Sequence, residues 1–187
     1  MRYYNEKASL YYVFNDEGGY AERNTEGGGA VNMGITFTVF VAWRQSKGVP
    51  YSTFADLKAM TQEEATEIYK AHFLSAIHFD DLPAGVDYVV LNAAIQGGVT
   101  GSIKLLQTAL KIKPVDGHYG LVTRWAARHR HAPDLINWIC DEQLAKYKTF
   151  KRFSEPYKDG AKRTWGDIWT ARIKLVNKRA QAMVEIQ

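Results

Sequence analysis

Two glutamates, Glu17 and Glu26, are the residues of this chain best suited to catalysis. They lie nine residues apart in a glycine-rich segment, and an apolar run that ends at Phe14 precedes the first of them. Cleavage of a glycosidic bond needs a protonated carboxyl at the leaving oxygen and a second group that steers water or stabilises positive charge. A helix C-terminus and apolar neighbours favour the protonated form of an acid, whereas a polar loop favours the ionised form. The pair therefore suits glycosidic acid–base chemistry, with Glu17 as the acid and Glu26 as the base or electrostatic partner.

The elements around the two glutamates can be predicted from periodicity and from glycines. Apolar positions indicate a helix over residues 5–16, which breaks at Gly18-Gly19. Residues 18–34 are polar and rich in glycine, so we expect a loop or a short irregular hairpin whose backbone can approach an extended polymer closely. A buried helix is expected to resume over residues 38–46. The glutamates would thus lie at a helix end and in the loop that follows it.

The rest of the chain also reads as helical. Thr61-Gln62-Glu63-Glu64 has the pattern of a capping box, with Thr61 as the N-cap of a helix that runs to about residue 73. Residues 87–96 are nearly all apolar, which is typical of a helix buried on every side. Further helices are expected over residues 100–111, 119–130, 133–152 and 166–185. We therefore predict a mainly α fold, with the 187 residues forming a single domain.

Charge divides this domain into two lobes. Residues 1–100 hold seven Lys and Arg against twelve Asp and Glu, whereas residues 101–187 hold seventeen against eight. Residues 1–100 contain both glutamates and are the predicted catalytic lobe, and 101–187 is a basic helical lobe. A basic lobe attracts polyanions such as nucleic acid, an anionic wall polymer or a membrane surface, although solvated Lys and Arg on helix faces would give the same composition.

The sequence also excludes several classes of protein. The single cysteine, Cys140, allows no internal disulfide and reads as a buried helical thiol. The N-terminus carries an early acid and no long apolar core, so we expect no signal peptide and synthesis in the cytoplasm. His118, His129 and His131 lack the spacing of a zinc site, and no serine elbow occurs, so neither a metal nor another cofactor is expected. A basic run that could touch nucleic acid comprises Arg124, Arg128, Arg130 and His131.

Several motifs, in the same order, resemble glycoside hydrolase family 108, the N-acetylmuramidases of phage endolysins and of bacterial proteins described as secretion activators. The resemblance spans nearly the whole chain. In the first half it is carried by Glu17-Gly18-Gly19-Tyr20, Gly27-Gly28-Gly29, Asn32-Met33-Gly34-Ile35-Thr36, Leu57-Lys58-Ala59-Met60-Thr61, Leu82-Pro83-Ala84-Gly85-Val86 and Asn92-Ala93-Ala94-Ile95-Gln96-Gly97-Gly98. In the second half it is carried by Leu105-Leu106-Gln107, Val115-Asp116-Gly117-His118-Tyr119-Gly120, Arg163-Thr164-Trp165 and Trp169-Thr170-Ala171-Arg172, and the first two of these resemble a predicted peptidoglycan-binding region.

The resemblance implies a role for each residue of the segment. Glu17 falls on the family's catalytic glutamate. Glu26 takes the place where the family usually has an aspartate, and Asn32 lies where phage-type lysozymes place a threonine. The longer acid at position 26 shifts a carboxylate by about an ångström, and a misplacement of that size can cost about 100-fold in rate.

The function that follows from the resemblance is hydrolysis of the β-1,4 bond between N-acetylmuramic acid and N-acetylglucosamine by a lysozyme-like helical domain. Tyr20 and Thr36 would shape the cleft, and Asn92 and Gln96 would contact sugar amides. The expected partner is peptidoglycan, with an anionic wall polymer or a membrane surface at the basic lobe and no specific nucleic acid. A monomer is expected that acts on the wall after release from the host cytoplasm, as an endolysin does.

Three other functions stay open from the sequence. A lytic transglycosylase would also use one glutamate but would leave an anhydro sugar. A wall-binding pseudoenzyme would result if the changes at Glu26 and Asn32 had abolished turnover. A helical nucleic-acid-binding protein would use the basic second half of the chain.

Overall fold

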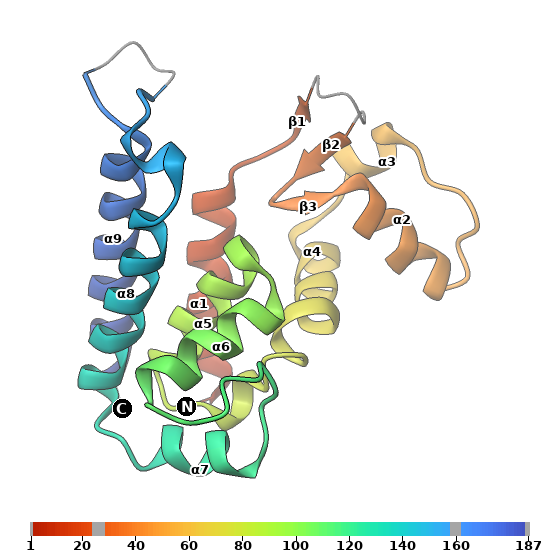
Figure 1. The fold of residues 1–187 in the computed structure, drawn as a ribbon. Helices are drawn as coiled ribbons and strands as arrows, with labels where there is room; N and C mark the ends of the chain where they lie inside the picture. The colour runs from red at the N-terminus through yellow and green to blue at the C-terminus, as the bar shows by residue number, and fades with distance from the viewer. Residues whose placement is uncertain (1, 24–28, 158–161, 186–187) are drawn as a thin grey trace. The chain divides into compact units, whose positions relative to one another are not determined.

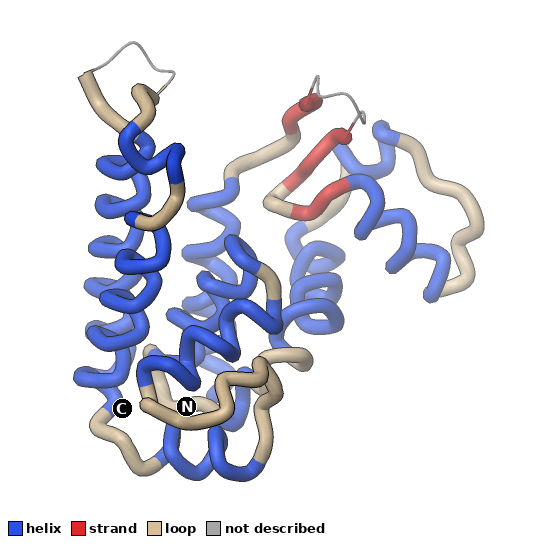
Figure 2. Tube along the Cα trace, in the orientation of Figure 1, coloured by secondary structure: helices blue, strands red, loops and turns tan. Residues whose placement is uncertain are grey.

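The computed structural model describes residues 2–23, 29–157 and 162–185. Helices make up most of this part of the chain, and the strands form one small sheet (Figure 2). The chain divides into two compact units, Glu6–His72 and Met1–Asn5 together with Phe73–Gln187. The predicted mainly helical fold is confirmed, whereas the predicted lobes 1–100 and 101–187 rest on charge and resemblance and stay predictions.

The unit Glu6–His72 combines helices with the sheet. Helix α1 (Arg2–Glu17) leads into strands β1 (Ala21–Arg23), β2 (Gly29–Asn32) and β3 (Ile35–Thr36), which are antiparallel in the order β1-β2-β3 (Figure 1). Helices α2 (Phe37–Ser46), α3 (Phe54–Lys58) and α4 (Gln62–Tyr69) follow, and α4 continues into a π-helical turn over Lys70–Leu74. The described residues of the glycine-rich segment thus form short antiparallel strands, as the predicted short hairpin requires.

Three threonines set the starts of the helices in this unit. Thr61 Oγ1 accepts a hydrogen bond from the Glu64 amide at 3.2 Å, so the predicted N-cap of α4 is confirmed. Thr53 forms a reciprocal capping box with Asp56, whose carboxylate accepts from the Thr53 amide at 2.6 Å. Thr36 caps α2. Because each cap satisfies a backbone amide that has no intrahelical partner, the caps define where these short helices begin.

The second unit is built around helix α5 (Val86–Gly97). Helices α6 (Val99–Ala109), α8 (Ala132–Lys148) and α9 (Trp165–Glu185) pack against it, and α8 and α9 lie side by side (Figure 1). Every residue from 86 to 94 is buried, as the apolar run predicts. Gly85 precedes α5 with φ +77°, and a Cβ there would run into the carbonyl oxygen of Ala180. The start of the central helix thus touches the α9 backbone.

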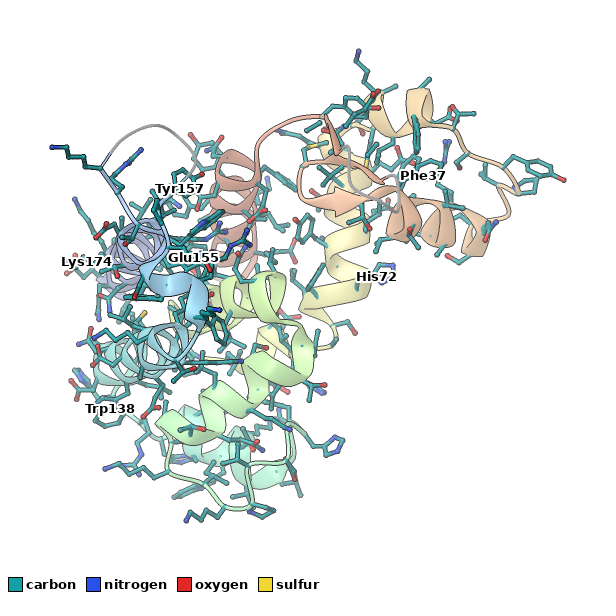
Figure 3. All side chains as sticks on the ribbon, turned by 45° about the horizontal axis from the view of Figure 1, so that its top comes forward. Phe37, His72, Trp138, Glu155, Tyr157 and Lys174 are labelled. Atoms are coloured by element: carbon teal, nitrogen blue, oxygen red, sulfur yellow. The ribbon has the colours of Figure 1, made fainter. Side chains whose placement is uncertain are left out.

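The remaining elements of this unit complete its ends. Short 3₁₀ turns cover Phe79–Asp81 and Lys151–Ser154, and helix α7 (Leu121–Arg128) lies between α6 and α8. Between α8 and α9, the Tyr157 amide donates a hydrogen bond to the Arg163 carbonyl at 2.8 Å; Figure 3 labels this tyrosine and Glu155.

Cys140 on α8 is buried as predicted, and burial raises its thiol pKa to about 11. In the described part of the chain, every helix is too short or too polar to cross a membrane.

Asp87 is a buried acid in the first turn of α5. Its side chain is 3 % exposed, accepts from the Tyr88 amide at 2.7 Å and accepts from Asn5 Nδ2 at 3.2 Å. Burial outweighs these hydrogen bonds and raises the pKa of Asp87 to about 7. The protonated form is therefore favoured in the folded protein below about pH 7.

We expect the contribution of Asp87 to the free energy of unfolding to fall as pH rises from about 4 to about 7, because the native state holds a proton on Asp87 that the unfolded chain has already released. Asp87→Asn removes this dependence, so the variant gains about 2–4 kcal/mol relative to wild type across that range. Urea unfolding at pH 4, 5.5 and 7.5 measures the difference, with the exposed Asp141→Asn as control. A stability difference that is constant with pH would contradict the assignment.

Candidate active site

Glu17 is the last residue of α1, and its side chain is half-buried. The helix ends there because Gly18 adopts φ +74°, a conformation that glycine reaches without steric cost. The Gly18 amide donates to the Phe14 carbonyl at 3.2 Å and so closes the last turn. The structure therefore places Glu17 at the helix terminus that the sequence predicts, between the helix and the sheet.

A tight turn packs against the Glu17 side chain. Met33 and Gly34 connect β2 to β3 with φ values of +48° and +77°, the pattern of a two-residue type I′ turn. A Cβ on Gly34 would lie 3.0 Å from Glu17 Cγ and 2.6 Å from Tyr69 Oη. Only glycine fits at this position, so the turn fixes the space available to Glu17.

Tyr69 supports the turn from the other side. It is fully buried at the end of α4, and its hydroxyl donates to the Met33 carbonyl at 3.0 Å. Its ring meets Phe14 edge to face, with the centroids 5.6 Å apart. Tyr69 thus ties the turn to α1, close to the candidate acid. Sequence reasoning related Ile68-Tyr69 to the family but gave Tyr69 no role in the site, because 36 positions separate it from Met33.

Tyr20 lies between the candidate acid and the first strand. Its hydroxyl donates to Glu22 Oε1 at 2.9 Å, and the Lys58 ammonium lies 5.6 Å from its ring centroid. Burial and the Glu22 carboxylate raise the pKa of Tyr20. The ring is half-buried, so it presents an aromatic surface held by two charged neighbours, and its predicted contact with substrate stays a prediction.

The Asn32 side chain is hydrogen-bonded to the backbone of α3, a neighbouring helix. It is 5 % exposed, and its Nδ2 donates to the Leu57 carbonyl at 2.8 Å and to the Lys58 carbonyl at 3.4 Å. These two bonds come from the side-chain nitrogen and hold β2 against α3. The predicted help of Asn32 with the attacking water stays a prediction, and it would have to come from the side-chain oxygen.

We expect Asn32→Ala to lower the free energy of unfolding by about 1–3 kcal/mol, because one buried and one partly buried hydrogen bond are lost. Cleavage of cell wall by the folded variant should fall less than about tenfold if Asn32 mainly holds the strand in place. Thermal unfolding and wall clearance on the same samples measure the two effects. Loss of cleavage by about 100-fold or more at unchanged stability would instead give Asn32 a direct part in the reaction.

The other predicted site residues are placed as follows. Thr36 is exposed, and its hydroxyl accepts from the Val39 amide at 3.5 Å as the N-cap of α2. Glu26 lies outside the described residues. Asn92 and Gln96 lie on α5, in the second unit. Asn92 is 3 % exposed, and its Nδ2 has no hydrogen-bond partner among the described residues. Gln96 is exposed. Their predicted contacts with substrate stay predictions.

In the part of the chain that the structure describes, His, Cys, Asp and Glu form no group of three that could hold a metal ion. The chemistry that Glu17 itself can supply is that of a half-buried carboxyl group packed against the Met33-Gly34 turn. Such a group can give a proton to a leaving oxygen and take one from water.

Comparison with known proteins identifies the family to which this region is similar. The sequence pattern of the glycosyl hydrolase 108 family matches residues 10–98, which include the second half of α1, the sheet and α5. The solved structure of SagA from Brucella abortus is similar, with 37 % sequence identity, a TM-score of 0.76, and coverage of 96 % of this chain and 95 % of that one. A search of curated proteins returned no match. These similarities confirm the predicted lysozyme-like helical fold and the resemblance to glycoside hydrolase family 108. The peptidoglycan-binding region in the second half of the chain stays a prediction.

Proposed function

The chain belongs to the glycosyl hydrolase 108 family and is a glycoside hydrolase of the cell wall, and we propose that it is an N-acetylmuramidase. It would hydrolyse the β-1,4 bond between N-acetylmuramic acid and N-acetylglucosamine in peptidoglycan. One observation carries the proposal: Glu17 lies at the end of α1 within the region matched by the family, half-buried and packed on the Met33-Gly34 turn.

In this proposal Glu17 protonates the oxygen that leaves with N-acetylglucosamine. Positive charge then develops at C1 of N-acetylmuramic acid, where water forms the new bond. Glu26 would orient or deprotonate that water, or stabilise the charge. Because proton transfer requires a fixed donor, the rigid support from Gly34 and Tyr69 is the structural contribution to this step.

Tyr20 is proposed to border the sugar site, since its ring is half-exposed beside Glu22 and Lys58. Thr36 would contribute through the start of α2, which follows β3 directly. The reaction needs no cofactor, because two carboxylates and water suffice. Stable binding of long glycan strands would use the basic lobe 101–187, which the resemblance relates to a peptidoglycan-binding region.

The cellular role we propose is that of a phage or prophage endolysin. The protein would be synthesised in the host cytoplasm, reach the wall after release and act as a monomer. Expression in bacteria with and without a pore-forming partner tests this role. Lysis that requires the pore-former supports it, and lysis without one would contradict it.

Clearance of purified sacculi by the wild-type protein tests the proposed activity. We expect a suspension of sacculi to lose turbidity and chitin, which lacks N-acetylmuramic acid, to be cleaved much more slowly. Binding to sacculi without loss of turbidity would show a wall-binding pseudoenzyme instead. Equal cleavage of chitin would show that the muramic acid residue is not recognised.

A further inference from the structure

Helix α7 exposes its large apolar residues and buries its small ones. Leu121 is 83 % exposed, Val122 is 68 % exposed and Trp125 is 65 % exposed. The residues that α7 buries are Thr123 and Ala127. Soluble helices normally bury their large apolar side chains, so a face of this kind marks an interaction surface. Figure 1 shows α7 at the periphery of its unit, directly before α8.

A shallow pocket accompanies this face. It has a volume of about 470 Å³ and is lined by Leu121, Arg124, Trp125, Arg128 and His129. Trp125 stacks on the His129 ring with the centroids 4.4 Å apart, and Arg124 forms an ion pair with Asp81 at 2.7 Å. The arginine and the aromatic stack are thus held in place around exposed aliphatic groups.

Basic residues line the pocket and are frequent in the sequence around α7. Residues 101–131 contain six Lys and Arg against a single acid, Asp116. The two basic residues that line the pocket alternate with apolar ones along α7, so cationic and apolar groups share one face. A partner that fits this face must offer both negative charge and an apolar phase.

We propose that α7 docks on an anionic phospholipid surface. Leu121 and Val122 would enter the boundary between headgroups and acyl chains, Trp125 would lie at the headgroup level, and Arg128 would contact lipid phosphates. An anionic wall polymer would match the charge but would leave the aliphatic side chains in water. A second copy of the chain would bring two basic faces together, which like-charge repulsion opposes. This inference does not depend on the proposed muramidase activity.

Sedimentation with lipid vesicles tests the inference. We expect the full-length protein to bind vesicles of phosphatidylglycerol and phosphatidylethanolamine, to bind phosphatidylcholine vesicles weakly, and to lose affinity as salt rises. The double variant Leu121→Ser/Val122→Ser should bind anionic vesicles about tenfold or more weakly, since two apolar side chains no longer enter the lipid. Leu175→Ser is the matched control, because Leu175 is a 43 % exposed leucine on α9.

Three further readouts decide the outcome. Thermal unfolding should be unchanged in the double variant. Wild-type binding to an anionic wall polymer but not to vesicles would overturn the inference in favour of the polymer. A dimer in sedimentation velocity that the double variant abolishes, without vesicle binding, would overturn it in favour of self-association.

Discussion

Glutamine in place of Glu17 is expected to lower cleavage of sacculi by about 10²- to 10⁴-fold, because general acid catalysis contributes a factor of this size. The amide has nearly the same shape and can still accept and donate hydrogen bonds, but it has no proton to give to the leaving oxygen. Initial rates of turbidity loss at equal protein concentration measure the effect.

The control for this experiment is Glu67→Gln. Glu67 is an exposed carboxylate of the same unit, paired with Lys47 at 3.6 Å. We expect this variant to cleave as fast as wild type, and both variants to unfold at nearly the wild-type temperature. If Glu17→Gln cleaved sacculi at the wild-type rate, Glu17 would not be the proton donor.

Alanine in place of Gly34 is expected to lower the free energy of unfolding by about 2–4 kcal/mol. The φ value of +77° strains any residue with a Cβ, and the added Cβ would meet Tyr69 Oη at 2.6 Å and Glu17 Cγ at 3.0 Å. The variant should also lose wall cleavage at temperatures where it stays folded, since relief of the clash moves the Glu17 side chain. Urea unfolding and clearance rates measure the two effects.

Gly48→Ala separates strain from crowding in this prediction. Gly48 has φ +85° in the same unit, but a Cβ there meets nothing within 4 Å. Gly48→Ala should therefore lower the free energy of unfolding only through backbone strain, by about 1 kcal/mol, and should leave wall cleavage unchanged. Equal destabilisation by Gly34→Ala and Gly48→Ala would show that a Cβ at position 34 does not clash with Glu17 and Tyr69.

The longer helices could be predicted because their signals are local. The apolar run of α5 and the Thr61 cap of α4 lie within short windows of sequence, and both occur in the structure as expected. Helix α3 was not predicted, since five residues give too little periodicity and its capping box at Thr53 is its main signal. Strands of two to four residues likewise carry no readable alternation.

The site was only partly predictable for a different reason. Glu17 could be recognised from its neighbours in sequence, whereas the contact between Tyr69 and Met33 depends on the packing of α4 against the sheet. The sequence predicts that Asn32 helps to orient the attacking water, but its side-chain amide donates to carbonyls of α3, a helix that was not predicted. Sequence also predicted a helix over residues 119–130 without showing that Leu121 faces outward.

The measurement that tests the central claim most directly is mass spectrometry of sacculi digested in water enriched in ¹⁸O. Hydrolysis by an N-acetylmuramidase places one ¹⁸O on C1 of N-acetylmuramic acid, so the account predicts labelled fragments with reducing muramic acid ends from wild type and almost none from Glu17→Gln. Unlabelled anhydro-muramic ends would show a lytic transglycosylase, and label on N-acetylglucosamine would show cleavage of the other glycosidic bond. Either result would contradict the proposed muramidase.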